Sequence, residues 1–114
     1  MRSAIDSEAG AGAVLALAIV GAVVLIGLAA MSFGAAMTVR QATIGAADAA
    51  ALAAADGASG AVSGDPCRLA AQVAAADGAA LASCRLDGLV ATIGVAARFG
   101  PFPVRALSTA GPPP

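Results

Sequence analysis

An uncharged run of 31 residues, from Ala9 to Val39, constrains this chain more than any other feature. A helix of that length rises about 46 Å at roughly 1.5 Å per residue, and the hydrocarbon core of a bilayer is about 30 Å thick. Its most apolar part, Val14–Phe33, is long enough to cross a bilayer by itself. The run therefore predicts a transmembrane helix.

The residues in front of this run differ from a secretory signal. Signal peptides begin with positive charge and have an apolar segment of about 7–15 residues. Here Arg2 is followed by Asp6 and Glu8, and the apolar segment is far longer. We expect a retained anchor; the alternative is a signal peptide cleaved near the small residues of LAAMSFGAA. Arg2 on one side and Arg40 on the other do not decide the orientation.

The helix is expected to continue beyond the membrane. Residues 40–56 contain no Pro and are rich in Ala, the best helix former. Gly57 then opens GASGAVSGD, a composition typical of a flexible linker. We predict one helix over roughly residues 11–55. Ile44 and Leu52 are the only large apolar side chains of its outer half, so that half needs a packing partner.

Three glycines recur inside the apolar run at steps of six and seven residues: Gly21, Gly27 and Gly34. Small residues let membrane helices approach one another closely, which makes these the candidate helix-packing positions. The alternative is that a composition so rich in Ala and Gly produces such spacings by chance. The general smallness of the side chains still indicates a helix that packs against other helices.

Residues 64–78 carry the start and stop signals of a second, short helix. Asp65 suits the N-cap, Pro66 the first helical position and Gly78 the position after the last turn. One side of the corresponding helical wheel holds Cys67, Leu69, Ala70, Val73 and Ala74. This side is expected to be buried.

Residues 80–99 predict a β-hairpin. Asp87 and Gly88 have the composition of a two-residue type I′ turn. The register that follows pairs Leu86 with Leu89, Cys84 with Ala91 and Ala82 with Ile93. Cys84 then lies on the face that the short helix should cover. A third strand is expected over residues 104–110, after a kink at GPFP.

Cys67 and Cys84 face the same interface in this arrangement, with 16 residues between them. A disulfide that closes such a loop stabilises by about 3 kcal/mol, mainly through the unfolded chain. It requires an oxidising compartment. The alternative is two buried free thiols, but we predict the disulfide. The N-terminus is then cytoplasmic and the C-terminal part lies outside the cell membrane.

The composition argues against catalysis and against nucleic-acid binding. The chain has no His, Lys, Tyr or Trp, so no imidazole or amine is present to activate a serine. Two Cys without His cannot complete a zinc site, and the Asp residues lack the spacing of a calcium loop. A net charge of −1 leaves no basic footprint for nucleic acid. We expect a non-enzymatic protein without cofactor, metal, nucleic-acid partner or small-molecule substrate.

These patterns together predict an α+β chain. A long N-terminal transmembrane helix continues outside the membrane and leads into one helix packed on a two- or three-stranded antiparallel sheet. The expected segments are a cytoplasmic flank (1–8), the transmembrane helix with its extracytoplasmic extension (9–56), a flexible linker (57–65), a small external helix-plus-hairpin domain (66–110) and a Pro-rich tail (111–114).

Three stretches are also similar to a known family: DSEAGAGAVLALAIV before and into the run, RQATIGAADAAALAAA after it, and GDPCRLAAQVAAADGAALASCRLDG. The chain resembles the short actinobacterial form of the TadE/TadG-like proteins of Tad (Flp) pilus-assembly loci. The resemblance implies a minor-pilin-like, single-pass protein of the bacterial cell membrane. Its implied partners are other TadE/TadG-like proteins, the Flp-type pilin and the pilus-assembly platform.

The resemblance also gives Glu8 an expected role in helix register. In type IV pilin-like proteins, an acid five residues into the mature chain helps to capture a neighbour's terminal amine. Glu8 takes that position only if a prepilin peptidase cuts between Ser3 and Ala4. Pilin leaders end in Gly rather than Ser, and the aromatic residue that usually follows the acid is missing, so we expect an unprocessed chain. Alternatively, Asp6 and Glu8 stabilise the helix N-terminus through its macrodipole, by about 0.3–1 kcal/mol.

Two other functions are compatible with the same residues. One is a small secreted or anchored binding module that acts alone. The other is a regulatory membrane subunit of an export complex that does not enter a filament.

Overall fold

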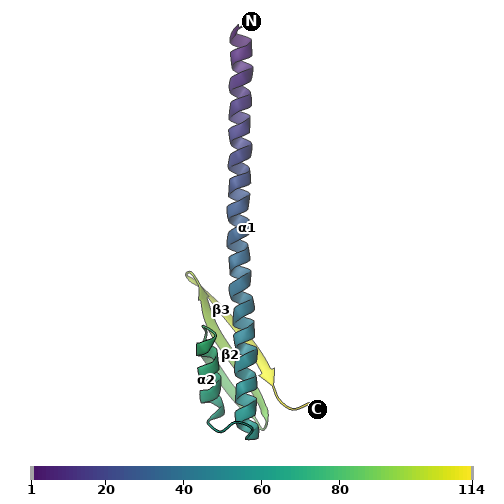
Figure 1. Ribbon diagram of the computed structural model, residues 1–114, viewed down its shortest axis with the longest axis vertical. Helices are drawn as coiled ribbons and strands as arrows, with labels where there is room; N and C mark the ends of the chain where they lie inside the picture. The colour runs from purple at the N-terminus through teal and green to yellow at the C-terminus, as the bar shows by residue number, and fades with distance from the viewer. Residues whose placement is uncertain (1, 114) are drawn as a thin grey trace. The chain divides into compact units, whose positions relative to one another are not determined.

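The computed structural model describes residues 2–113, with side chains from residue 8 onward. Its elements are α1 (Arg2–Ser59), α2 (Pro66–Ala76), β1 (Ala80–Asp87), β2 (Val90–Phe99) and β3 (Phe102–Ala110) (Figure 1). The strands form one antiparallel sheet in the order β1-β2-β3. This is the predicted α+β class. The chain divides into two compact units, Met1–Ala35 and Ala36–Pro114.

The first unit is the N-terminal part of α1. Its large apolar side chains are exposed along its length, from Val14 at 68 % to Phe33 at 67 %. The most apolar window of the helix has a mean hydropathy of 2.8, and none of that window is buried. Within the described residues, α1 is the helix long and apolar enough to cross a membrane.

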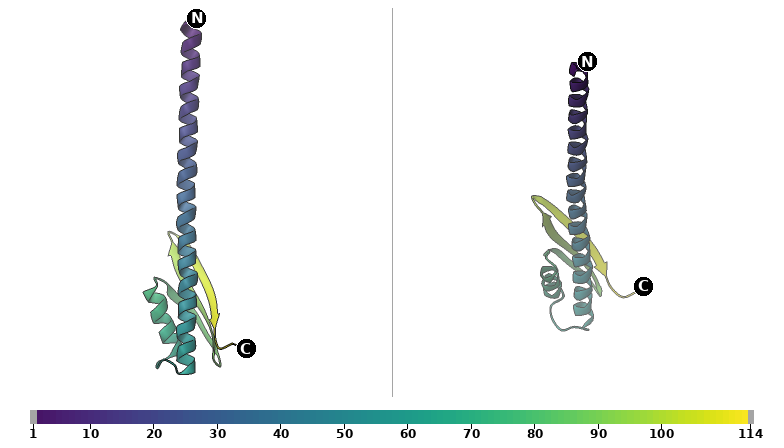
Figure 2. Two further views of the ribbon diagram at one scale, coloured as in Figure 1. Left: turned by 45° about the vertical axis from the view of Figure 1, so that its right-hand side comes forward. Right: turned by 45° about the horizontal axis from the view of Figure 1, so that its top comes forward.

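In the second unit, α2 and the last part of α1 lie on one face of the sheet (Figures 1 and 2). The core between these layers is built mainly from alanine. Its buried members are Ala46, Ala47, Ala50, Ala51, Ala54, Ala70, Ala74, Ala91, Ile93 and Val95. Thr43 is also buried, and its hydroxyl donates to the Val39 carbonyl at 2.7 Å. Because alanine is short, each of these side chains contributes little buried apolar area.

Helix α2 begins and ends as the sequence predicted. The Asp65 carboxylate accepts a hydrogen bond from the Cys67 N–H at 2.9 Å, and a proline occupies the first turn. At the other end Gly78 has φ 80°, the left-handed conformation that glycine adopts most readily. The Gly78 N–H donates to the Ala75 carbonyl and the Ala79 N–H to the Ala74 carbonyl. These two bonds form a Schellman motif.

Helix α1 is longer at both ends than the predicted span over residues 11–55. It begins at Arg2 and continues through Gly57 to Ser59, so the expected linker is reduced to residues 60–65. A Cβ at Gly57 would lie 2.9 Å from Leu69 Cδ1 and 3.1 Å from Pro66 Cα. The glycine therefore lets the last turn of α1 approach the start of α2, and does not end the helix.

The expected external domain over residues 66–110 is only part of the second unit. That unit begins at Ala36, because the alanines of the last part of α1 supply half of its core. The sheet and α2 alone would leave the covered face of β2 open. The helix that enters the unit is thus also one of its structural layers.

The β1–β2 turn lies one residue further along the chain than predicted. Gly88 and Leu89 form it, Asp87 pairs with Val90, and Gly88 has φ 62°. Glycine at the first central position is typical of a type II′ turn, so the type I′ turn predicted at Asp87-Gly88 is wrong. Cys84 consequently pairs with Ile93 and not with Ala91. A shift of two residues along the partner strand preserves the face, so Cys84 still faces α2.

A β-bulge changes which residue of β1 contributes to the core. The register shifts between Leu81, which pairs with Val95, and Ser83, which pairs with Gly94. Leu81 is half-buried against the core, whereas Ala82 is exposed. The prediction that Ala82 shares the covered face with Ile93 is wrong, because it assumed uninterrupted alternation along the strand.

Candidate assembly and membrane-anchoring surfaces

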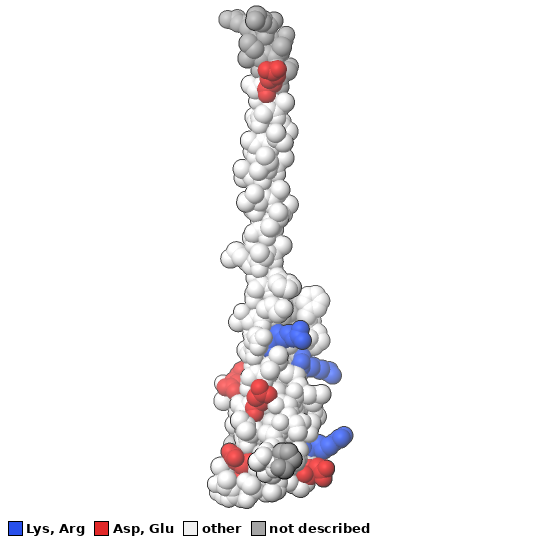
Figure 3. Space-filling view, turned by 90° about the vertical axis from the view of Figure 1, so that its right-hand side faces the viewer, with Lys and Arg blue, Asp and Glu red and all other residues white. Residues whose placement is uncertain are grey.

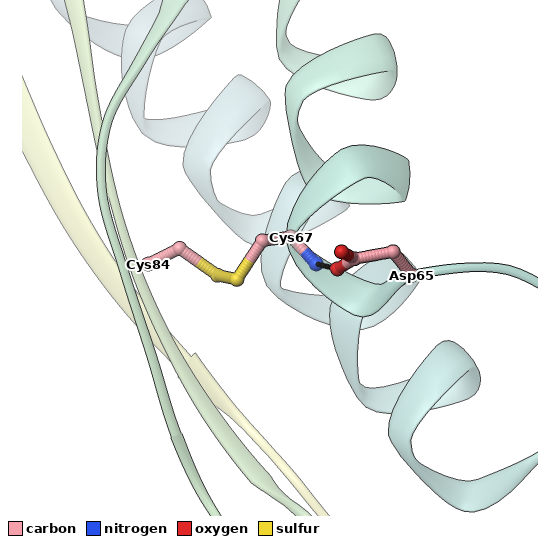
Figure 4. Close-up of a disulfide and its surroundings, with 3 residues drawn as sticks. All are labelled: Asp65, Cys67 and Cys84. Carbon is pink, nitrogen blue, oxygen red and sulfur yellow. Dashed lines mark hydrogen bonds between the residues drawn. A yellow bond between two sulfur atoms is a disulfide. The ribbon is translucent and has the colours of Figure 1, made fainter.

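The predicted disulfide is present between Cys67, near the start of α2, and Cys84 on β1. Their Cα atoms are 5.9 Å apart and 17 positions separate them in the sequence. Figure 4 shows the bond beside the N-cap of α2, where the Cys67 N–H donates to Asp65. The cross-link therefore joins α2 to the sheet at the point where the helix begins. Its role in this position is structural.

Glu8 lies on α1 with its side chain exposed. Because α1 begins at Arg2, the first turn of the helix contains no acidic residue. The macrodipole effect falls off within the first turn, so the interpretation in which Glu8 caps the helix N-terminus is not supported. The side chain of Asp6, and those of Ser3 and Ala4 at the considered cleavage position, lie outside the described side chains.

The structure leaves room for a side chain at each of the candidate packing glycines. A Cβ built at Gly21, Gly27 or Gly34 has no atom from elsewhere within 4 Å. At about 100° per residue, Gly27 and Gly34 lie within roughly 20° of each other around the helix, and Gly21 lies about 120° from Gly27. Two of the three predicted positions therefore share a side of α1, and the third does not.

Charged side chains are absent from a long stretch of α1. In Figure 3 this stretch is white, between an acidic side chain near the start of the helix and the acidic and basic groups of the second unit. The sequence places Glu8 and Arg40 at its two ends. A helix that is apolar on every side and unburied is typical of a membrane span.

The last part of α1 also has an outward stripe, defined here as Ile44, Asp48 and Leu52. Ile44 is 37 % exposed and Leu52 is 59 % exposed, on the side of the helix away from the alanines. The sequence predicted that this half of the helix needs a packing partner, and it is the alanines, not these two large residues, that are buried. The signal that could have found the buried face is Ala at i+3, i+4, i+7, i+8 and i+11 after Thr43, all of which are buried with Thr43.

Leu52 borders two hollows between α1 and the C-terminal end of the sheet. One is shared with Asp48 and with residues 108–110 of β3. The other is shared with Leu89, Gly111 and Pro112, after the end of β3. The stripe and these hollows form a mixed apolar and acidic surface beside β3.

No metal centre is formed in the described part of the chain. Between residues 8 and 113, no three His, Cys, Asp or Glu side chains come together in a possible metal site, and both cysteines are in the disulfide. The candidate functional features of the described residues are therefore surfaces. They are the apolar anchor, the two aligned glycines and the outward stripe.

Comparisons of the chain with protein-family models, curated proteins and solved structures found no match. The function is therefore argued from the residues and surfaces of this chain.

Proposed function

We propose that the protein is a non-enzymatic, membrane-anchored subunit of a Tad/Flp-type pilus or secretion apparatus, with a pseudopilin-like assembly role. It crosses the bacterial cell membrane once, with its N-terminus in the cytoplasm and residues 36–114 outside. Its partners are other TadE/TadG-like proteins, the Flp-type pilin and the assembly platform. The three stretches of family-like sequence support this proposal.

The observation that carries the proposal is the division of α1 into two kinds of surface. Its first part is apolar and unburied on all sides, and its last part is a layer of the external unit's core. Small residues promote close packing between membrane helices, and two glycines share one side of the span. The same helix thus supplies both the membrane-spanning surface and a layer of the external unit.

The disulfide supports the proposed orientation. Disulfides persist in oxidising compartments and are rare in the cytosol. The Cys67–Cys84 bond lies in the second unit, after the span. This preference supports an external location for that unit and, with a single span, a cytoplasmic N-terminus.

Glu8 is the residue through which the proposal is tested. We expect Glu8→Ala to abolish co-purification of pilin-like partners with the membrane complex in mild detergent, because the exposed carboxylate at the start of the apolar run helps to set the axial register of α1 against neighbouring helices. Asp6→Ala is the matched control, removing an acid two residues away. Equal recovery of partners with Glu8→Ala and the unchanged chain would contradict the register role.

One observation favours a second candidate, a small secreted binding module. The second compact unit begins at Ala36, within the small-residue stretch considered as a cleavage region. This candidate requires a soluble species that lacks the residues before about Ala36. The intact mass of the protein separates it from the anchored subunit.

A further inference from the structure

The end of the β2–β3 hairpin is apolar and exposed. Phe99 pairs with Phe102 across the turn formed by Gly100 and Pro101, with Gly100 at φ 56°. Phe102 is 65 % exposed, and Pro101 and Pro103 are exposed as well. These side chains contribute nothing to the alanine core of the unit, so the core does not explain them.

This hairpin end lies at the end of the second unit where α1 enters it (Figures 1 and 2). Arg98 on β2 lines a hollow together with Val39, Ala42 and Thr43 of α1. Beyond Arg98 the hairpin continues by about two residues, or roughly 7 Å, to its turn. The hairpin end therefore extends from the level of Val39 toward the first residues of the unit.

The uncharged run of α1 ends within the first residues of the unit. The uncharged run ends at Val39, and Arg40 is the first charged residue after it. A rise of about 46 Å over the run matches the roughly 40–45 Å thickness of a bilayer that includes its headgroups. A span of this length would put Arg40 in the headgroup layer, and the hairpin end extends toward the residues that precede Arg40.

The charge around the hairpin end is mainly positive. Arg98 precedes it on β2 and Arg105 follows it on β3, both exposed, and Arg40 is exposed on α1. The nearby carboxylate is that of Asp77, which lines the same hollow as Arg98. Basic residues close to a bilayer are attracted by anionic headgroups, and aromatic rings prefer the interface between headgroups and hydrocarbon.

We propose that residues 99–103, flanked by Arg98 and Arg105, form a lipid-contact site that docks the external unit on the anionic bilayer surface from which α1 emerges. The site restricts the tilt of the external unit and presents the outward stripe to neighbouring subunits in one orientation. It depends on the membrane anchor alone and requires no pilus partner. Failure of the assembly proposal would therefore leave it intact.

The absence of Trp and Tyr from the chain provides a direct test. Phe102→Trp introduces a single fluorophore at the hairpin end of the full-length protein, reconstituted in nanodiscs that contain anionic phospholipid. The matched control is Leu107→Trp, at a β3 position that is 75 % exposed and about 17 Å further along the strand. Retention of the disulfide and of the circular dichroism spectrum verifies folding of both variants.

We expect the Phe102→Trp emission to be blue-shifted and to lose most of its intensity when the lipids carry bromine near the headgroups, with weak quenching by acrylamide. The Leu107→Trp emission should be red-shifted, should lose little intensity with the brominated lipids and should be quenched strongly by acrylamide. Adding Arg98→Gln or Arg105→Gln to Phe102→Trp should lower the ratio of docked to free hairpin about fivefold each in anionic nanodiscs. Emission of Phe102→Trp that matches Leu107→Trp would overturn the proposal. Protection from both quenchers would do so too, because it would indicate a protein partner on the hairpin end.

Discussion

Cys67 and Cys84 connect two elements that share little apolar area. The residues of α2 that are buried against the core are Ala70 and Ala74, which have small side chains. Val73 is partly buried against the same core, and with so few large buried side chains the covalent bond to β1 adds to the attachment of α2. The cap at Asp65 adds a hydrogen bond at the same end of α2.

Replacing both cysteines, Cys67→Ala with Cys84→Ala, should lower the free energy of unfolding by about 3 kcal/mol. For a unit of this size the melting temperature should fall by roughly 12–24 °C. Thermal denaturation in detergent, followed by circular dichroism, measures the change. Reducing agent should produce a similar loss in the unchanged chain and none in the double variant; an unchanged melting temperature under reduction would contradict the structural role.

Gly94 is a second residue whose size matters, on the open face of the sheet. A Cβ at this position would contact the Ser83 hydroxyl oxygen and lie 3.1 Å from Leu107 Cδ2. Its φ is not in the left-handed region, so space rather than backbone conformation selects glycine here.

Gly94→Ala should therefore destabilise the second unit by about 1–3 kcal/mol, the usual cost of crowding a packed site. Adding Ser83→Ala removes the oxygen and should restore most of the loss, because the remaining Ser83 Cβ contact at 3.6 Å is ordinary. Chemical denaturation of the single and double variants measures both effects. A double variant no more stable than Gly94→Ala would show that Ser83 is not the cause.

At the level of elements, α1 has two different faces in the second unit. Ala50 on the covered face is 0 % exposed, whereas Leu52 on the outward stripe is 59 % exposed. Ala50→Leu should cost about 1–3 kcal/mol of stability, because no room exists between helix and sheet. Leu52→Ala should change stability by less than about 0.5 kcal/mol. Equal effects of the two substitutions in denaturant unfolding would contradict this assignment of faces.

Much of this arrangement could be predicted from local signals. The apolar span, the caps of α2 at Asp65 and Gly78, and the presence of a hairpin depend on neighbouring residues, and the structure confirms them. The disulfide was predictable because both cysteines lie on faces that were correctly assigned.

The remaining features depend on contacts between distant parts of the chain. Gly57 suggested a helix end, but it lies inside α1. Pro66 and Leu69 come so close to this position that a side chain would not fit there. The turn position and the bulge near Ala82 follow from how β1 fits β2, and composition alone does not contain that information. Which side of α1 is buried likewise depends on how the helix packs on the sheet and α2. The alanines are buried there and Ile44 is exposed.

For the molecule as a whole, the state of the N-terminus separates the proposed functions. We expect the membrane-extracted protein to retain all 114 residues, and to be lighter by two hydrogen atoms before reduction than after it. Intact mass spectrometry of reduced and non-reduced samples measures both properties. Loss of the first three residues would instead give Glu8 the pilin-like position, and a soluble species that begins near Ala36 would favour the secreted module.

Association of the anchor with other helices is the central claim, and photo-crosslinking in the native membrane tests it most directly. Val23 lies about 40° from Gly27 around α1, and Leu25 lies on the opposite side; they are 62 % and 68 % exposed. A photoreactive residue is placed at each position in turn, and the adducts are identified by mass spectrometry. We predict adducts with pilin-like membrane proteins from position 23 and mainly lipid adducts from position 25. Lipid adducts alone from both positions would contradict the proposed assembly role.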